Sequence, residues 1–521
     1  MRRNILVTKI LLVGMFLAVF NQSCTNLDEE VYSDITPDKF FKTDEEFIAA
    51  LGAAYTSLYF FGGHNSYMSV QEVMSDEIVI PQRGGDWYDG GQWLRTHRHE
   101  QNAAEEGIGN AWNNLYGGIN TCNRLIFQFE SLVADGSVSQ EAADAFIAEL
   151  KTLRALFYFW LLDTFGNVPI VDRFDVPADF APAQSTRAEV FDWVEQELLE
   201  NVPKLTKMVD QSTYGRVHYY VGQAILAKLY LNAEVYTGTA RWDDCIAACN
   251  EIINSGAYSL ENNFFDNFKT ENGSSKENIF VIPYDEVFAG GFFLAQMTLH
   301  YGSQATYNLQ AQPWNGYCSL QEFYNKFEDW DVRKKSFIEG PQYASDGVTP
   351  VLDPGVEPDD PDGPQVNFTP EINEHFPNCL RQAGVRVGKF EFKLGATPNL
   401  SNDFPLFRYA DILLTKAEAL WRKNPNDAEA LALVNQVRAR ACVDPNNCPM
   451  LMQLTAEDLL DERAREMFYE AWRRQDLIRF DKFCDAWDFK PVTQDCENRK
   501  LWPIPSAQLN ANPNLVQNPG Y

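Results

Sequence analysis

The sequence predicts a mainly α-helical protein with a tetratricopeptide-like helical-repeat scaffold and an irregular, loop-rich lobe. Three observations predict this class. Apolar residues recur at three- and four-residue intervals over several long segments. Two pairs of these segments have the length of a helix–turn–helix repeat and carry alanines where facing helices must approach closely. Segments with strand character are few and short.

The helical segments follow one another in a clear order. The first ends at Gly166 and Asn167, which form a helix stop signal. Each pair is divided by a short turn, Thr-Gly-Thr in one case and Asn-Pro in the other. The helices expected, in chain order, cover residues 146–165, 217–236, 242–254, 406–422, 428–441 and 457–483. Strands are expected only at residues 278–283 and 390–394.

Two segments between these helices differ in composition. Residues 288–321 are rich in Gly, Gln, Asn and aromatic residues without a helical period, and residues 340–370 are rich in Pro, Asp and Gly. We expect them to form a loop lobe on the helical scaffold. Because scaffolds commonly position functional loops, this lobe is the expected ligand-binding part of the molecule.

Composition limits the possible partners. The chain has 521 residues and is 45% hydrophobic, enough to bury a large core. It carries 43 Lys and Arg against 73 Asp and Glu, a formal net charge of −30. Such a surface repels phosphate backbones, so a role in nucleic-acid binding is disfavoured and neutral partners are favoured.

The N-terminus predicts export. Arg2, Arg3 and Lys9 precede an apolar stretch over residues 10–20 that is too short to span a bilayer. We expect residues 1–23 to be a lipoprotein signal peptide and Cys24 to be the lipidation site and mature N-terminus. The mature chain is expected to consist of parts 24–235 and 236–521, packed as one globular unit.

An ordinary secretory signal with an unrelated cysteine is the alternative interpretation. Asn21 stands where lipoprotein signals usually carry an apolar residue. The acidic residues Asp28, Glu29 and Glu30 favour acylation, because they resemble the surface-export tag of lipoproteins in some Gram-negative lineages. Export also permits disulfides.

Of ten cysteines, nine remain after Cys24, so at least one must be free. Cys442 and Cys448 bracket an Asp-Pro-Asn-Asn turn and form the better disulfide candidate, whereas Cys245 and Cys249 lie one helical turn apart. With only six histidines and no zinc-like spacing, no metal site and no cofactor are expected.

Residues 76–99 are the segment most like a binding site. Flat aromatic rings stack on the CH faces of sugars, and planar carboxylate and guanidinium groups hydrogen-bond hydroxyls. Glycines would keep the rings near the surface. A buried tryptophan hairpin is the alternative, because Trp is usually buried. The predicted ligand residues of this loop are Arg83, Asp86, Trp87, Tyr88, Asp89 and Trp93.

Five segments in order resemble the SusD/RagB family of the starch-utilisation type. They are residues 27–59 (LDEEVYSDITPDKFFKTDEEFIAALGAAYTSLY), 153–170 (LRALFYFWLLDTFGNVPI), 404–420 (FPLFRYADILLTKAEAL), 461–480 (DERAREMFYEAWRRQDLIRF) and 501–521 (LWPIPSAQLNANPNLVQNPGY). The resemblance implies a surface-exposed lipoprotein of the outer membrane. Such a protein would capture oligosaccharide or polysaccharide for a SusC-like TonB-dependent transporter. A peptide- or glycopeptide-capturing RagB-like lipoprotein is the alternative.

The resemblance also implies ligand contacts in the region of residues 288–317. The candidates there are Tyr301, Tyr307, Trp314 and Asn315.

No enzymatic motif accompanies the resemblance. The charges of residues 461–480 alternate at helical spacing and predict ion pairs three or four residues apart, worth a few tenths of a kcal/mol each. Glu462 and Glu466 share one helix face, but neighbouring arginines would hold both ionised, so neither suits an acid catalyst. The chain is therefore not expected to be an enzyme.

Overall fold

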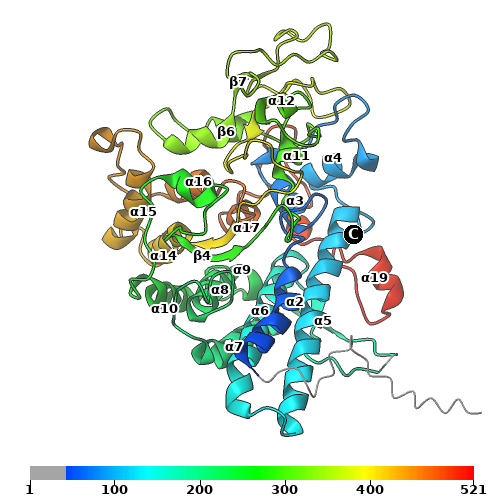
Figure 1. The fold of residues 1–521 in the computed structure, drawn as a ribbon, viewed down its shortest axis with the longest axis vertical. Helices are drawn as coiled ribbons and strands as arrows, with labels where there is room; N and C mark the ends of the chain where they lie inside the picture. Colours follow the sequence, from blue (N-terminus) through cyan, green and yellow to red (C-terminus); the bar gives the residue numbers. More distant parts are fainter. Residues whose placement is uncertain (1–42, 178) are drawn as a thin grey trace, which may run out of the picture. The chain divides into compact units, whose positions relative to one another are not determined.

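The computed structural model describes residues 43–177 and 179–521, and residues 47–521 form one compact unit. Helices make up most of the regular structure, as predicted (Figure 1). The first half contains α2 (Asp44–Thr56), α3 (Tyr67–Val73), α4 (Gln92–His97), α5 (Glu106–Ala134), α6 (Gln140–Thr164), α7 (Arg187–Asn201), α8 (Tyr219–Leu231), α9 (Ala233–Thr237) and α10 (Trp242–Ile253). The second contains α11 (Leu294–Thr298), α12 (Ser303–Tyr307), α13 (Gln321–Tyr324), α14 (Tyr409–Lys423), α15 (Ala428–Arg440), α16 (Ala456–Met467), α17 (Arg473–Arg479), α18 (Cys496–Arg499) and α19 (Ser506–Ala511).

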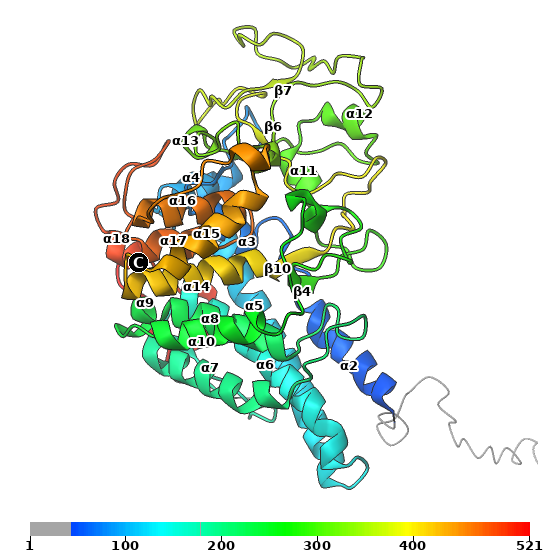
Figure 2. The ribbon, with the colours of Figure 1, turned by 90° about the vertical axis from the view of Figure 1, so that its left-hand side faces the viewer.

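The long helices pack in succession. Helix α6 lies between α5 and α7, α10 packs on both α8 and α14, and α14 packs on α15 (Figure 2). Small residues allow the close approach. A Cβ atom at Gly118 of α5 would lie 2.4 Å from the Phe157 ring of α6, so only glycine fits there. The short elements α11, α12, β6 and β7 form a lobe at one end of this helical stack (Figure 2).

The strands form two-stranded antiparallel pairs. Strand β1 (Ile78–Val79) pairs with β5 (Cys318–Ser319), β2 (Val168–Pro169) with β3 (Gln184–Ser185), β4 (Asn278–Ile282) with β10 (Phe404–Arg408), β6 (Phe337–Ile338) with β9 (Arg386–Val387), and β7 (Gly340–Pro341) with β8 (Asn367–Phe368). The prediction at residues 278–283 is confirmed by β4. The prediction of a strand at residues 390–394 is wrong. Phe390 is a buried core residue whose ring stacks on that of Phe404 at 5.4 Å, and it forms no strand.

Two predicted helices have different boundaries. The segment 217–236 is divided between α8 and α9 at Asn232, whose side chain bonds back to the Lys228 carbonyl at 2.9 Å. The segment 406–422 begins as a helix only at Tyr409, because the residues before it belong to β10. The helices expected at residues 242–254 and 428–441 are confirmed as α10 and α15.

The long helix expected at residues 457–483 is wrong. It is broken between α16 and α17, where Tyr469 and Ala471 have φ angles of 57° and 62°. Both residues donate backbone N–H groups to buried carboxylates of another part of the chain. Tyr469 bonds Glu77 at 3.0 Å and Ala471 bonds Glu72 at 2.7 Å. Tertiary hydrogen bonds therefore override the local helical pattern here.

Apart from Asp461, the charged side chains of residues 461–480 are buried. Local pairs three residues apart do occur, as in Arg465–Glu462, but most partners come from distant segments. Burial opposes ionisation of Glu462, yet Arg333 and Arg465 outweigh it and lower the pKa of Glu462 to about 2. The pKa of Glu466 is also well below its usual range. Both carboxylates are held ionised, as predicted.

The predicted disulfide is confirmed, and free cysteines are present as expected. Cys442 and Cys448 form a disulfide, and Cys484 and Cys496, which the spacing did not suggest, form a second. The remaining cysteines of the described chain are free and buried. Cys24 lies outside the described residues.

Candidate ligand-binding site

The two sequence segments predicted to bind ligand lie together. Strand β1 begins the first segment and pairs with β5 at the end of the second, with Ile78 opposite Ser319 and Val79 opposite Cys318. This antiparallel pair holds the loop after β1 against the loop before β5. The indole N–H of Trp87 donates to the carbonyl of Trp314 at 2.7 Å. The β1–β5 pair and this hydrogen bond thus bring together residues that lie more than 200 positions apart in the sequence.

An aromatic cluster forms at this junction around His64. The imidazole centroid lies 5.2 Å from the ring of Trp87, 5.4 Å from Trp93 and 6.2 Å from Trp314. Its Nδ1 atom is 2.9 Å from the hydroxyl of Tyr317. Trp314 is 39% exposed and Trp87 is partly exposed, so two indoles remain accessible over a packed base.

The position of Trp87 depends on local backbone and on a glycine. Trp87 has a φ of 66°, a left-handed conformation that costs a non-glycine residue free energy and persists only where other contacts hold it. A Cβ atom at Gly316 would lie 2.3 Å from the Trp87 ring. Gly316 therefore allows the indole to lie directly on the backbone of the facing loop. Strain of this kind is typical of functional sites.

A cavity of about 600 Å³ is lined by Asp86, the residue before Trp87 in the chain. The predicted ligand residues Asp86 and Tyr301 line it, and the tyrosine hydroxyl donates to the carboxylate. Burial and the neighbouring Asp86 raise the pKa of Tyr301 to about 12. The guanidinium of Arg381 lies 4.5 Å from the Tyr301 ring and donates to both carboxylate oxygens of Asp353, at 2.6 and 3.0 Å. The cavity thus presents polar groups with one ion pair, Arg381–Asp353, and a further carboxylate, Asp86.

A second cavity of about 490 Å³ touches the cluster through His64. Asp89 lines it and accepts the indole N–H of Trp93 at 2.8 Å. Gln92 and Arg95, from α4, form another wall. The predicted ligand residue Asp89 therefore faces this cavity and not the larger one.

Three predicted ligand residues are buried and support the loops from beneath. Trp93 is 1% exposed. The guanidinium of Arg83 donates to the carbonyls of Leu380 and, at 2.9 Å, Ala383. The amide of Asn315 donates to the Arg381 carbonyl at 2.9 Å and accepts from Arg386 at 2.8 Å. Apart from Arg83 Nε, which is buried without a hydrogen-bond partner, their polar atoms bond within the protein, which corrects the expectation that they contact ligand.

The remaining candidates lie at the edges. Tyr88 is 50% exposed and its ring lies 6.1 Å from that of Phe376, which is also exposed. Tyr307 packs against Phe392 and lines neither cavity, and burial raises the pKa of Tyr307 to about 12. Tyr88 therefore extends the exposed aromatic surface, whereas Tyr307 is separate from it.

Sequence reasoning missed His64 and Arg381. His64 follows two glycines after an aromatic run, Tyr-Phe-Phe-Gly-Gly-His-Asn, and that mixture of glycine, aromatic and polar residues could have marked it. Arg381 follows Asn-Cys-Leu, which gives no such signal, so only the fold reveals its place beside Tyr301.

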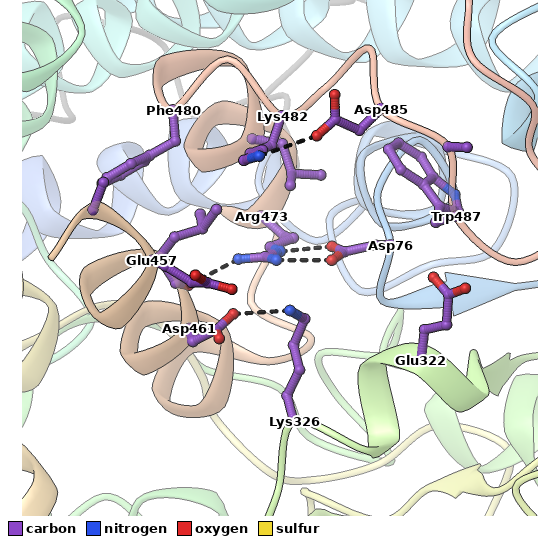
Figure 3. Close-up of a pocket in the computed structure, with 14 residues that line it drawn as sticks. Asp76, Glu322, Lys326, Glu457, Asp461, Arg473, Phe480, Lys482, Asp485 and Trp487 are labelled. Atoms are coloured by element: carbon purple, nitrogen blue, oxygen red, sulfur yellow. Dashed lines mark hydrogen bonds and ion pairs between the residues drawn. The ribbon is translucent and has the colours of Figure 1, made fainter.

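A third cavity, of about 490 Å³, lies between α13, α16 and the segment after α17, and no residue of the aromatic cluster lines it (Figure 3). Its charged side chains mostly pair with one another. Arg473 donates to both oxygens of Asp76, at 2.6 and 2.7 Å. Lys326 pairs with Asp461 at 2.8 Å and Lys482 with Asp485 at 3.2 Å. Because these groups satisfy each other, this cavity is less suited to a polar ligand than the other two.

Between residues 43 and 521, leaving out 178, no three His, Cys, Asp or Glu side chains gather as metal ligands. Over the same ranges, no helix has both the length and the apolar character needed to cross a membrane.

Family comparisons now identify the fold. A family model described as the SusD family matches residues 394–521, and one described as "Starch-binding associating with outer membrane" matches residues 26–231. The chain is also 28% identical over 421 residues to the starch-binding protein SusD of Bacteroides thetaiotaomicron, a match that covers 72% of each chain. The chain belongs to the SusD/RagB family.

Solved structures share the SusD fold. A SusD superfamily protein from Parabacteroides distasonis superposes with a TM-score of 0.74 at 20% identity, covering 92% of this chain and 100% of that one. Surface glycan-binding protein A from Bacteroides thetaiotaomicron, in complex with laminarihexaose, gives a TM-score of 0.70 at 23% identity, covering 91% of this chain and 99% of that one. At these identities the likeness concerns the fold.

Proposed function

We propose that this SusD/RagB protein is a cell-surface glycan-binding lipoprotein. It captures an oligosaccharide or polysaccharide and delivers it to a partner TonB-dependent, SusC-like outer-membrane transporter. The chain binds and does not catalyse. One observation carries the proposal: the accessible rings of Trp87 and Trp314 both contact His64, next to cavities lined by carboxylate, amide and hydroxyl groups.

This arrangement suits a neutral sugar chain. Accessible rings offer apolar faces for pyranose stacking, and the neighbouring polar groups hydrogen-bond hydroxyls. In the larger cavity the charges of Arg381 and Asp353 are paired with each other, so they do not call for a charged ligand. The names of the similar proteins, a starch-binding protein and a surface glycan-binding protein, support the same ligand class.

The test is a calorimetric titration of the purified chain, without its signal segment, against neutral hexasaccharides and charged peptides at low and high salt. Neutral sugars should bind with an affinity that is nearly independent of salt, because no net charge is neutralised on binding. Peptide binding that weakens as salt rises, in the absence of any sugar binding, would favour the capture of peptides or glycopeptides instead.

The anchor and the partner are part of the proposal. Acylation requires the thiol of Cys24, so Cys24→Ala should be exported but lost from the outer membrane. Gentle detergent extraction of the wild-type protein should recover a TonB-dependent barrel with it. Normal membrane retention of Cys24→Ala would exclude the lipid anchor, and recovery of the chain alone would count against a stable transporter complex.

A further inference from the structure

The smaller cavity at the aromatic cluster contains an unsatisfied amide. Gln92, the first residue of α4, is only 6% exposed and lines the cavity. Its side chain makes no hydrogen bond to any residue that the structure describes, yet its amide atoms are not sealed inside the protein. A buried polar group normally has a partner. Because Gln92 lines the cavity, a group bound there could supply the missing partner of its amide.

His64 adds a hydrogen-bond acceptor to the cavity. The hydrogen bonds of Ser69 and Tyr317 determine which of its two ring nitrogens accepts. The hydroxyl of Ser69 donates to the Gly63 carbonyl at 3.2 Å, so Ser69 accepts the Tyr317 hydroxyl at 2.9 Å. Tyr317 must then accept from His64 Nδ1, which carries the hydrogen. Burial lowers the pKa of His64 to about 4 despite the neighbouring Asp89, so the imidazole is neutral at pH 7. His64 Nε2 is left as an acceptor.

The charges around the cavity are mainly negative. Arg95 donates to both carboxylate oxygens of Glu105, at 2.6 and 2.9 Å, so its charge is already matched. Asp89 and Glu106 remain without a cationic partner in the described structure. An anionic ligand would meet repulsion here, whereas a hydroxyl could donate to the carboxylate or to the imidazole.

We propose that this cavity is a subsite for one neutral sugar ring, with a hydroxyl donating to His64 Nε2 and another bonded to the Gln92 amide. The subsite selects against uronic or sulfated sugars. The inference rests on the proposed function and names its ligand class. The adjacent indoles of Trp87 and Trp314 would hold the next sugar rings of the same glycan, because His64 contacts both indoles.

The test uses a fixed panel of laminarihexaose, maltohexaose, cellohexaose and hexagalacturonate. The wild-type protein should bind at least one neutral member and bind hexagalacturonate more weakly. Gln92→Ala and His64→Phe should each weaken binding of the best neutral member about three- to tenfold, the effect of losing one hydrogen bond to the ligand. Gln196→Ala, an exposed glutamine of α7, is the matched control and should bind normally.

Two further measurements make the result decisive. Thermal unfolding should be similar in Gln92→Ala and wild type, which separates lost contact from lost fold. Nitrogen-15 NMR of the histidines, assigned with His64→Phe, should show hydrogen on Nδ1 of His64. Unchanged sugar affinity in both variants, or tighter binding of hexagalacturonate, would overturn the subsite and leave the glycan-binding proposal standing. Failure of wild type to bind any panel member would contradict both.

Discussion

Trp87 and Trp93 lie six positions apart in one loop and have opposite roles. The local mixture of aromatic, polar and glycine residues predicted a ligand-binding loop at residues 76–99. It could not predict which ring is exposed, because exposure depends on the facing loop. Gly316 leaves space for Trp87, whereas Trp93 turns inward to bond Asp89. The same limit explains the burial of Arg83 and Asn315, whose partners lie about 300 and 70 residues further along the chain.

Trp93→Ala tests whether Trp93 is a buried supporting residue and Trp314 an exposed ligand-binding residue. Truncating this buried indole should lower the unfolding free energy by about 3–5 kcal/mol, because it removes packing and leaves a cavity. Trp314→Ala, at a ring that is 39% exposed, should lower the free energy of unfolding much less. Thermal and denaturant unfolding of the two variants would measure this. Equal destabilisation would mean that Trp314 is also a core residue.

At the scale of elements, helices with clear apolar periods were predictable and their ends were not. Helices α10 and α15 were correct because flanking turns stop them locally. The break after α16 was missed because its causes, Glu72 and Glu77, lie almost 400 residues away. The burial of the charged side chains of α16 was missed for the same reason, because their partners come from distant segments. Glu466 of α16 bonds Arg333 at 3.0 Å, Arg408 of β10 at 2.9 Å and Arg440 of α15.

Glu466→Gln should therefore destabilise the fold strongly. The change keeps the shape of the side chain but leaves three buried arginines short of negative charge, at a cost of about 3–5 kcal/mol in unfolding free energy. Glu457→Gln is the control: Glu457 is exposed in the first turn of the same helix, and its loss should cost about 0.5 kcal/mol or less. Denaturant unfolding measures both. Similar midpoints for the two variants would show that the buried network contributes little.

For the whole molecule, the sequence was sufficient for the class of fold and for the family, because helical period and ordered motifs extend over most of the chain. It was less informative about the site, which depends on the pairing of β1 with β5, two strands of two residues each. Such short strands carry no periodic signal of their own. The resulting surface combines exposed rings with cavities in which carboxylates outnumber cationic groups, in a chain with a net charge of −30. These properties fit capture of a neutral glycan.

The most direct test of this account is a calorimetric titration of wild type and of the double variant Trp87→Ala/Trp314→Ala with a neutral hexasaccharide. Each stacked ring should contribute on the order of 1 kcal/mol, so the double variant should bind about tenfold or more weakly while unfolding at nearly the wild-type temperature. Undiminished sugar affinity in the double variant would contradict the account, because the exposed indoles would then not be the glycan-binding surface.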